Sequence, residues 1–441
     1  MIRTTRRFIL GAAALGPVAG CSVLDDLFTT EKIPIEGKRE SVLATARGTQ
    51  MEASDRRAVT LPPAIANAEW AQPGGVPSHV MGNLSTGDLT RSWHSSIGES
   101  GGYRARITAM PVVGGNQVFT MDPDGMVSAF DVAAGSRQWT TDTQGEDDRS
   151  TNVGGGLALA KGVVYAATGR GEVMTLDPRT GKIGWRSSLD APARSGPTVV
   201  DNRLFVPTID ERLLALDTAS GKRLWSYQAT ATSTSVLGVA APAYADGLVV
   251  AGFGSGDLVA LRAESGTLAW TDSLAAARGR NSLLDLSAIR ALPLISGGVV
   301  YAISLGSVLA ALDLRSGRRL WEREIAGQHT PCLAGDWLFL LSEDQTMLCI
   351  AKADGRVRWS SQLPRYGDPD KSRDPIFWSG PLLSGAYLYA AGSTEKLVAV
   401  NAATGEILGQ QELRGAAAFA PIAASGKMFI VTNDGSLTAL G

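Results

Sequence analysis

Short stretches of alternating apolar and polar residues, separated by turn residues, run through most of the chain. Between Val163 and Trp185 the sequence is VVYAATGRGEVMTLDPRTGKIGW. An apolar run meets a turn at Gly169–Gly171, a second alternating run meets a turn at Pro178–Gly181, and a third run ends on Trp185. Alternation with period two, bounded by Gly and Pro, is typical of short antiparallel strands. The pattern therefore predicts an all-β structure.

This unit recurs along the chain as an Asp, a Gly four residues later and a Trp eight residues later. The complete copies are Asp131, Gly135 and Trp139; Asp177, Gly181 and Trp185; Asp217, Gly221 and Trp225; and Asp313, Gly317 and Trp321. Two copies lack the Asp, namely Gly266 with Trp270 and Gly355 with Trp359, and a seventh has Asn401, Gly405 and then Gly409 at the Trp position. The Asp can accept hydrogen bonds from the turn backbone, the Gly allows positive φ, and the Trp buries a large flat surface.

The spacing of the Trp positions, about 40–50 residues, is the period of four-stranded propeller blades. At the C-terminus, Ala420–Leu440 supplies three strands without a fourth, and Asp88–Ile97, with Trp93, supplies a fourth strand without the other three. Pairing these ends would close a ring and remove a free edge. We therefore expect an eight-bladed β-propeller of four-stranded antiparallel blades over residues 84–441, with the last blade closed by an N-terminal strand. Seven blades is the alternative, if that strand is not part of the ring.

The first 20 residues have the features of an export signal. Arg3, Arg6 and Arg7 precede an apolar run, Phe8–Val18, that is too short to span a bilayer. The run ends in Val-Ala-Gly-Cys at 18–21, which resembles a bacterial lipobox and predicts lipidation of Cys21. The alternative is ordinary secretory cleavage beside an incidental Cys. The paired Arg residues leave twin-arginine and general export both open.

Residues 21–83 are rich in polar residues, Pro and Gly, and they predict an extended tether between the lipid anchor and the ring. Trp70 is a candidate for attaching part of this tether to the ring. The formal net charge of −2 gives no basic excess, so we expect no nucleic-acid partner. The lipobox instead predicts a lipoprotein that faces the periplasm and contacts the membrane through its lipid anchor alone, and Ser22, directly after the Cys, favours the outer membrane.

No pattern of catalytic residues stands out. His79, His94 and His329 lack metal-ligand spacing, and the chain has no nucleophile elbow or phosphate-binding loop. Cys332 and Cys349 fall on the first and third strands of one predicted blade, which are not neighbours, so two buried thiols are favoured over a disulfide. We therefore predict no catalytic, cofactor-binding or metal-binding residues.

Four connections between blades are unusually long, and loops on a rigid scaffold commonly carry binding sites. They are 142–152, 230–239, 274–291 and 363–378. The third contains Arg278 and Arg280 and the aliphatic residues Leu283, Leu284, Leu286 and Ile289. Either this loop binds a partner, or it forms a short amphipathic turn that packs on its own blade.

The repeats resemble the pyrroloquinoline-quinone-type propeller repeat, with Ala-Leu-Asp-Thr-Ala-Ser-Gly-Lys-Arg-Leu-Trp at 215–225 and Ala-Leu-Asp-Leu-Arg-Ser-Gly-Arg-Arg-Leu-Trp at 311–321. Quinoprotein dehydrogenases share this repeat, but the alcohol enzymes carry an adjacent Cys-Cys pair that this chain lacks. The lipobox, tether and single closed ring are similar to the BamB family of outer-membrane protein assembly lipoproteins. That resemblance implies a scaffold without catalytic activity or cofactor. The alternatives are a periplasmic quinone-dependent enzyme and a cell-envelope adaptor.

The BamB resemblance also implies partners, namely the POTRA domains of the barrel-inserting outer-membrane protein and unfolded outer-membrane protein clients. In this family two inter-blade loops are understood to make the contact. The residues of this chain that fall in or near them are Leu237, Arg278, Arg280, Leu283, Asp285, Leu286 and Arg290. Leu237 stands where a cation is expected, and Ala288 and Arg290 stand where acids are expected, so the partner class is implied more firmly than the single contacts.

Overall fold

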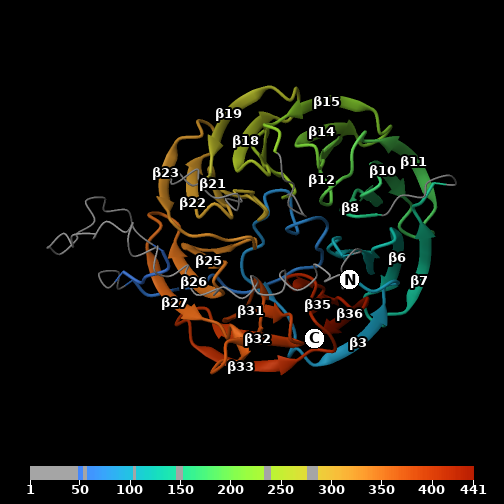
Figure 1. Cartoon of the computed structure of the whole chain (residues 1–441). Helices are drawn as coiled ribbons and strands as arrows, with labels where there is room; N and C mark the ends of the chain where they lie inside the picture. The colour runs from blue at the N-terminus through green and yellow to red at the C-terminus, as the bar shows by residue number, and fades with distance from the viewer. Residues whose placement is uncertain (1–47, 53–56, 103–105, 146–151, 233–239, 276–286) are drawn as a thin grey trace, which may run out of the picture. The chain divides into compact units, whose positions relative to one another are not determined.

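The protein is described by a computed structural model of residues 48–52, 57–102, 106–145, 152–232, 240–275 and 287–441. These residues form β-strands and turns, which confirms the predicted all-β class. The sheets follow one another in chain order around a ring (Figure 1). In the described part of the chain no helix is long and apolar enough to cross a membrane.

Seven of the sheets have four antiparallel strands each. In order from the inner to the outer strand, they are β4 (Val112–Gly114), β5 (Gln117–Met121), β6 (Met126–Asp131) and β7 (Arg137–Asp142); β8 (Gly155–Ala160), β9 (Val163–Thr168), β10 (Glu172–Leu176) and β11 (Ile183–Ser188); β12 (Thr198–Val200), β13 (Arg203–Pro207), β14 (Arg212–Asp217) and β15 (Arg223–Gln228); β16 (Ala243–Ala245), β17 (Leu248–Gly252), β18 (Asp257–Arg262) and β19 (Leu268–Ser273); β20 (Leu294–Ser296), β21 (Val299–Ile303), β22 (Leu309–Asp313) and β23 (Arg319–Arg323); β24 (Cys332–Ala334), β25 (Trp337–Leu341), β26 (Thr346–Ala351) and β27 (Val357–Gln362); and β34 (Ile422–Ala424), β35 (Lys427–Thr432), β36 (Ser436–Leu440) and β3 (Arg91–Ser96).

The last of these sheets joins the two ends of the chain. β3 pairs antiparallel with β36, with Trp93 opposite Ala439. This confirms the predicted closure by an N-terminal strand. A remaining sheet in the ring has six strands, in the order β1 (Ile65–Ala66), β2 (Leu84–Ser85), β30 (Trp378–Ser384), β31 (Tyr387–Gly392), β32 (Lys396–Asn401) and β33 (Ile407–Glu412).

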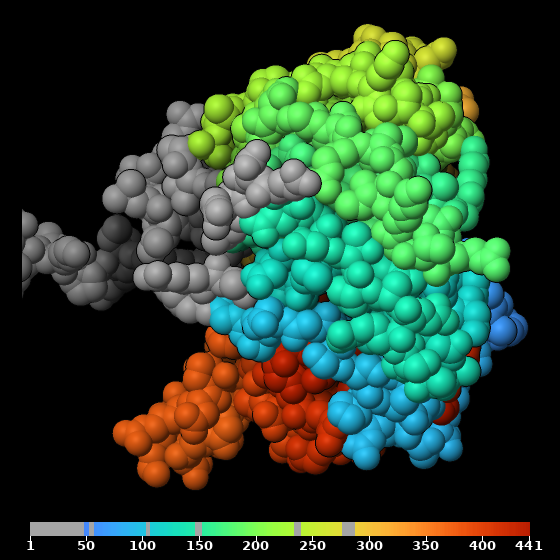
Figure 2. Space-filling model, turned by 90° about the vertical axis from the view of Figure 1, so that its right-hand side faces the viewer, coloured from blue at the N-terminus to red at the C-terminus, as the bar shows by residue number. Residues whose placement is uncertain are grey.

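The four-stranded sheets therefore number seven, as in the alternative prediction, and the expectation of eight four-stranded blades is wrong. The difference lies in the six-stranded sheet, where β1 and β2 add in parallel at the inner edge of β30–β33. A short hairpin of β28 (Tyr366–Asp368) and β29 (Arg373–Pro375) precedes that sheet. Figure 2 shows it protruding from one face of the molecule.

The predicted turn chemistry is present in the repeat around Asp177. One carboxylate oxygen of Asp177 accepts hydrogen bonds from the backbone nitrogens of Arg179 and Thr180, at 3.0 and 2.8 Å. Gly181, at φ +70°, ends the turn and donates its N–H to the Asp177 carbonyl at 2.8 Å. The Thr180 hydroxyl also donates to the same carboxylate oxygen at 2.9 Å, and this bond, together with the backbone bonds, lowers the pKa of the exposed Asp177 carboxyl. The Asp therefore stabilises the turn that carries the Gly.

Each repeat Trp joins its own sheet to the next one. The indole nitrogen of Trp185, on β11, donates to the carbonyl of Thr218 at 3.1 Å in the following sheet. The ring of Trp185 also lies against Gly221 in the turn between β14 and β15, where a Cβ atom would be 2.5 Å from the ring. The same pair of contacts links Trp93, Trp139, Trp225, Trp270, Trp321 and Trp359 to the sheets that follow them.

The seventh repeat has Gly409 where the other repeats have a Trp, and this difference has a structural reason. Gly409 lies opposite Ala399 in the register that places Trp139 opposite Ala129. The sheet that follows it is the one shared by both ends of the chain. Its two outer strands, β36 and β3, are not consecutive in sequence, so no tight Asp–Gly turn connects them. A Trp at position 409 would have no Gly turn to pack against.

The core lies between neighbouring sheets. Phe119 and Met121 of the first sheet form one buried cluster with Val164 and Met174 of the second. Further clusters of the same kind fill the spaces between other adjacent sheets. A single four-stranded sheet cannot cover both of its apolar faces, so each sheet depends on its neighbours.

Residues 57–87, the N-terminal segment, pass from the outer strand β27, where the side chain of Arg358 donates to the Arg57 carbonyl, to the inner edges of the sheets. Trp70 exchanges two backbone hydrogen bonds of 2.8 Å with Val113 on β4, and only 7% of it is exposed. The predicted attachment of Trp70 is therefore confirmed. Residues 57–83 are part of the ring and do not form the extended tether that was predicted for them. Residues 21–47 of the predicted tether, with Cys21, lie outside the described residues.

The N-terminal segment supplies acceptors to inner strands one after another. The backbone nitrogens that donate to it belong to Val113, Leu159, Val199, Tyr244 and Ile295. Their acceptors are the carbonyls of Trp70, Ala71, Pro77 and Ser78 and the side-chain oxygen of Gln72, at 2.6–3.0 Å. These five donors lie at equivalent positions on β4, β8, β12, β16 and β20. Without this segment, five edge N–H groups facing the narrow centre of the ring would lose their partners.

Candidate functional site

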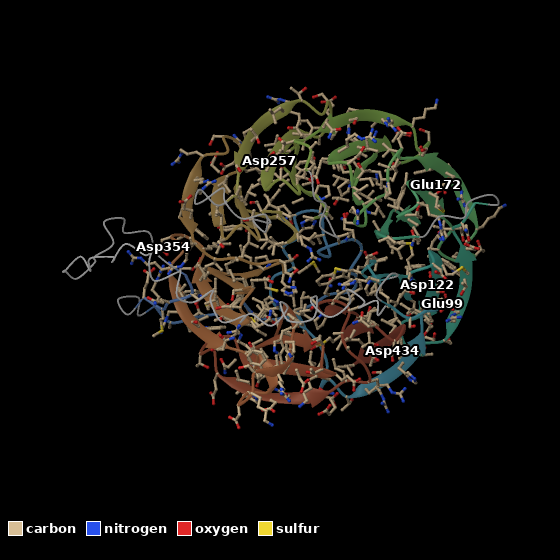
Figure 3. The ribbon with its side chains drawn as sticks, in the orientation of Figure 1. Glu99, Asp122, Glu172, Asp257, Asp354 and Asp434 are labelled. Atoms are coloured by element: carbon tan, nitrogen blue, oxygen red, sulfur yellow. The ribbon has the colours of Figure 1, made fainter. Side chains whose placement is uncertain are left out.

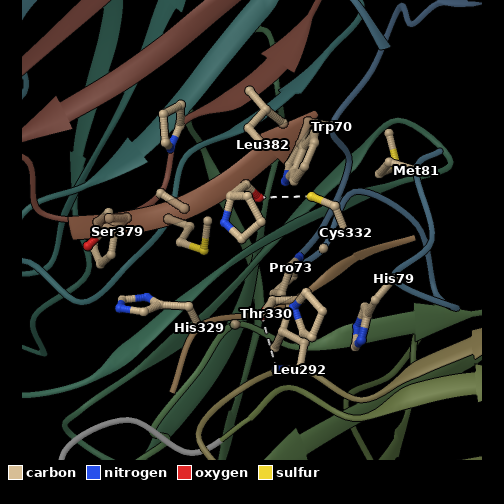
Figure 4. Close-up of a pocket in the computed structure, with 18 of the residues that line it drawn as sticks. Trp70, Pro73, His79, Met81, Leu292, His329, Thr330, Cys332, Ser379 and Leu382 are labelled. Atoms are coloured by element: carbon tan, nitrogen blue, oxygen red, sulfur yellow. Dashed lines mark hydrogen bonds between the residues drawn. The ribbon is translucent and has the colours of Figure 1, made fainter. Parts of the chain in front are cut away.

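A cavity of about 280 Å³ lies at the centre of the ring (Figure 4). One side is formed by the N-terminal segment, through residues such as Trp70, Pro73 and His79. The rest of the wall comes from segments that lead into inner strands, including Met110, Leu157, Arg194, Arg290, His329, Leu382 and Phe419. A mostly apolar wall with a few polar groups is the usual make-up of a small-molecule site, although this cavity is at the small end of the range, which begins at roughly 300 Å³.

Among the described residues, the charged side chains in the cavity wall are all positive. These lining residues include Arg194 and Arg290 and no Asp or Glu. The described Asp and Glu side chains lie outside the cavity wall. Asp122 and Asp434, for example, accept hydrogen bonds in turns between the second and third strands of their sheets, away from the centre (Figure 3). The cavity is therefore an electropositive place inside a chain whose net charge is slightly negative.

Arg194 lies in the short connection between β11 and β12, and only 9% of it is exposed. Its Nε and Nη1 atoms are buried and make no hydrogen bond with the described residues. Burial lowers the pKa of the Arg194 guanidinium, and the charge of Glu211 partly offsets that effect. Glu211 is itself committed to the backbone nitrogen of Gly254 at 2.8 Å. Arg194 is thus a buried cation without a direct ion-pair partner in the described part of the chain.

Two further polar groups of the wall come from the N-terminal segment. The Nδ1 atom of His79 is 2.7 Å from the Pro293 carbonyl, which can only accept, so Nδ1 carries the proton. That leaves Nε2 as a buried acceptor, without a hydrogen-bond partner among the described residues. Burial lowers the pKa of His79 to about 4, so the ring is neutral near pH 7. The indole N–H of Trp70 is likewise buried and unpaired within the described residues.

Arg290 lies on another part of the wall, where its Nη1 atom donates to the side-chain oxygen of Gln328. Burial lowers the pKa of Arg290, the carboxylate of Glu343 opposes that effect, and the charge of Arg106 adds to it. Burial and the charge of Arg290 lower the pKa of His329 to about 4. This cluster is therefore a cation accompanied by a neutral imidazole.

The two thiols occupy the predicted strands, Cys332 on β24 and Cys349 on β26. The Sγ atom of Cys332 donates to the Pro381 carbonyl at 2.8 Å (Figure 4), and burial raises the pKa of this thiol to about 12. A thiol with such a pKa is a poor nucleophile at neutral pH. Among the described residues, no group of three or more His, Cys, Asp and Glu side chains is placed to hold a metal ion.

Of the seven predicted partner-binding residues, Arg290 is the one that the structure describes. Leu237, Arg278, Arg280, Leu283, Asp285 and Leu286 lie outside the described residues. Ile289 is 1% exposed and packs in the core between the sheets of β16–β19 and β20–β23, which at this residue agrees with the alternative that the loop packs on its own blade. Arg290 lines the central cavity.

The described ends of the four long connections nevertheless share one location. Each connection links the outer strand of one sheet to the inner strand of the next, as in β7 to β8 and β27 to β30. Connections of this type emerge on a single face of a propeller, because corresponding strands of all sheets run in the same direction. The same face carries the β28–β29 hairpin and, after it, Phe377, which is 61% exposed.

Sequence inspection missed Arg194, Trp70 and His79 as parts of one site. Arg194 occupies a connection short enough to pass for an ordinary turn, and His79 lies in a region predicted to be a tether. The closed ring brings these residues to one cavity, although more than a hundred positions separate Arg194 from the other two. No spacing in the sequence could indicate that meeting.

The fold defines the class of protein as a closed β-propeller built from quinoprotein-type repeats. The family model described as "Outer membrane protein assembly factor BamB" matches residues 123–361 and 369–441. The chain therefore belongs to the BamB family.

Relatives support this assignment across most of the chain. The outer membrane protein assembly factor BamB of Salmonella typhimurium is 29% identical over 360 residues, which are 80% of this chain and 88% of that protein. BamB of Yersinia pestis is 27% identical over 79% of this chain and 88% of its own length. BamB of Escherichia coli is 26% identical over 80% and 88%.

Solved structures show the same fold. The crystal structure of BamB from Moraxella catarrhalis matches with a TM-score of 0.69 at 21% identity, covering 80% of this chain and 99% of that one. A quinohemoprotein alcohol dehydrogenase from Comamonas testosteroni matches with a TM-score of 0.64 at 15% identity, covering 86% of this chain and 81% of the enzyme. At these identities the likeness concerns the fold alone, so function has to be argued from the family and the site.

Proposed function

We propose that this chain is a lipid-anchored scaffold of the outer-membrane β-barrel assembly machinery, without catalytic activity of its own. The observation that carries the proposal is the match to the BamB family model over most of the propeller. The lipobox ending at Cys21 supports an anchor in the outer membrane, with the ring in the periplasm.

The docking partner in this proposal is the set of POTRA domains of the barrel-inserting subunit, and the clients are unfolded outer-membrane proteins. The docking face is the one that carries the four long connections and the β28–β29 hairpin. Phe377 gives this face an exposed aromatic side chain, and aromatic residues are frequent anchors at protein interfaces. Arg290 then acts from the cavity wall, in the same connection as the predicted contact residues Arg278, Arg280, Leu283, Asp285 and Leu286.

Affinity purification of the lipidated protein from crosslinked native membranes tests the proposal. We expect mass spectrometry to recover the barrel-inserting subunit and its accessory lipoproteins. Phe377→Asp and Leu283→Asp should reduce this recovery. Leu224→Asp is the matched control, because Leu224 is 47% exposed on the outer strand β15, away from the docking face. Recovery without the barrel-inserting subunit, or equal loss in the control, would refute the proposal.

A second candidate function is that of a periplasmic quinone-dependent dehydrogenase. The quinoprotein-type repeat and the central cavity favour it. The missing Cys-Cys pair weighs against it. Purified protein would then show quinone absorbance and dye-linked alcohol oxidation. A third possibility, an adaptor outside the assembly machinery, would leave the levels of outer-membrane barrels unchanged when the gene is deleted.

A further inference from the structure

The central cavity contains polar groups that the fold does not use. Arg194 is more than nine-tenths buried, and two of its nitrogen atoms have no partner among the described residues. The indole N–H of Trp70 on the same wall is also unpaired there. Burying a charged or polar group without a partner costs free energy, so such groups are concentrated where a ligand completes them.

The position of Arg194 is fixed by its surroundings. Its backbone nitrogen donates to the Pro207 carbonyl at 3.3 Å, and Gly196, two residues later, packs closely against Leu157 and against Pro73 of the N-terminal segment. A Cβ atom at position 196 would be 2.8 Å from the Leu157 carbonyl oxygen and 3.0 Å from the Pro73 ring. The backbone that carries Arg194 is therefore held at the junction of a rigid sheet and the N-terminal segment, on the wall of the cavity.

The positive charge of the cavity wall favours an anionic ligand. Arg194 and Arg290 line the cavity, no carboxylate from the described part of the chain does, and His79 and His329 are neutral near pH 7. A planar guanidinium matches a carboxylate through two parallel hydrogen bonds. The apolar remainder of the wall, with Met110, Leu157 and Leu382 among its residues, favours an organic body over an inorganic anion.

We propose that the central cavity is a binding site for a small organic carboxylate with an apolar body, whose carboxylate is bound by Arg194. This site differs from the docking face, because it lies inside the ring and requires no protein partner. The proposal and the scaffold function can therefore fail independently.

Titration calorimetry of the full-length lipidated protein in detergent, with a micelle blank, tests the proposal. The probe is 3-phenylpropionate, and 3-phenylpropionamide is the neutral analogue of nearly equal shape. We expect the carboxylate to bind at least about tenfold more tightly than the amide, since a charge-assisted hydrogen bond is lost with the charge. Inorganic phosphate should not compete at similar concentrations. No binding of the carboxylate, equal binding of the amide or equal binding of phosphate would overturn the proposal.

Substitutions at Arg194 locate the site. Arg194→Gln should weaken binding of 3-phenylpropionate by about tenfold or more, and Arg194→Lys should weaken it less, because it keeps the charge but loses the planar fork. Arg179→Gln, at an exposed turn between β10 and β11, is the matched control and should bind normally. Arg194→Gln should also leave the thermal stability of the ligand-free protein unchanged or raised, since an unpaired buried charge is removed. If Arg194→Gln binds 3-phenylpropionate normally and is less stable than the unmodified protein, Arg194 has a purely structural role. If Arg194→Gln does not fold, the same two results for Arg194→Lys lead to the same conclusion.

Discussion

The contact between Trp185 and Gly221 allows a quantitative test of how neighbouring sheets are joined. Gly221 has φ +69°, and a Cβ atom there would be 2.5 Å from Cε3 of Trp185 and 2.8 Å from Cζ3. Gly247, in the turn between β16 and β17, has a similar φ of +79°, and a Cβ atom there would meet no atom within 4 Å. The two glycines therefore share the backbone requirement and differ in the contact with the indole ring.

The expected free energies of unfolding follow from that difference. A non-Gly residue in the left-handed region costs roughly 1–2 kcal/mol, so Gly247→Ala should lower the free energy of unfolding by about this amount. Gly221→Ala adds the displacement of a packed indole, for which overpacking costs are typically 1–3 kcal/mol. Gly221→Ala should therefore cost about 2–5 kcal/mol in total.

Urea denaturation followed by tryptophan fluorescence measures both variants, with the slope m compared to confirm that the same unfolding transition is observed. A Trp185→Ala background provides the control, because the cost of Gly221→Ala should then fall to that of Gly247→Ala. If the two glycine variants are equally destabilised with Trp185 present, the indole contact does not contribute and the reasoning is refuted.

Three other predictions concern residues between positions 48 and 87. The pKa of His79 falls from 6.5 to about 4 on folding, so the folded state binds fewer protons in that interval, and the contribution of His79 to stability should drop by about 2 kcal/mol from about pH 7.5 to about pH 5; in urea titrations at several pH values, His79→Asn should remove this part of the pH dependence and leave the part due to His329, whose pKa is also lowered to about 4. Gln72→Leu leaves the Val199 N–H without its acceptor and should lower the free energy of unfolding by roughly 1–3 kcal/mol, whereas unchanged stability would mean that the inner edge needs no partner. Glu52→Gln weakens the 2.7 Å ion pair with Arg323, which is 4% exposed, and should cost about 1–3 kcal/mol in the same assay, with a smaller cost at high salt contradicting a buried pair.

The sequence by itself determined the repeated sheets, because their signals are local. Asp177 and Gly181 are four residues apart, and the hydrogen bonds that form their turn lie within that distance. Each Trp likewise stands at a fixed distance from its own Gly, so the register of every outer strand could be predicted. The closure by β3 followed from counting strands at the two ends of the chain.

The tertiary structure decided the course of residues 57–87, the count of four-stranded sheets and the contents of the central cavity. Trp70 meets Val113, and Asn67 donates to the Ala423 carbonyl at 2.9 Å, more than three hundred residues away. Such bonds depend on which sheet edges remain unpaired once the ring has closed, and they leave no period in the sequence. The same holds for Arg194, whose charge is ordinary in a surface turn and becomes an unpaired cation when the ring buries it.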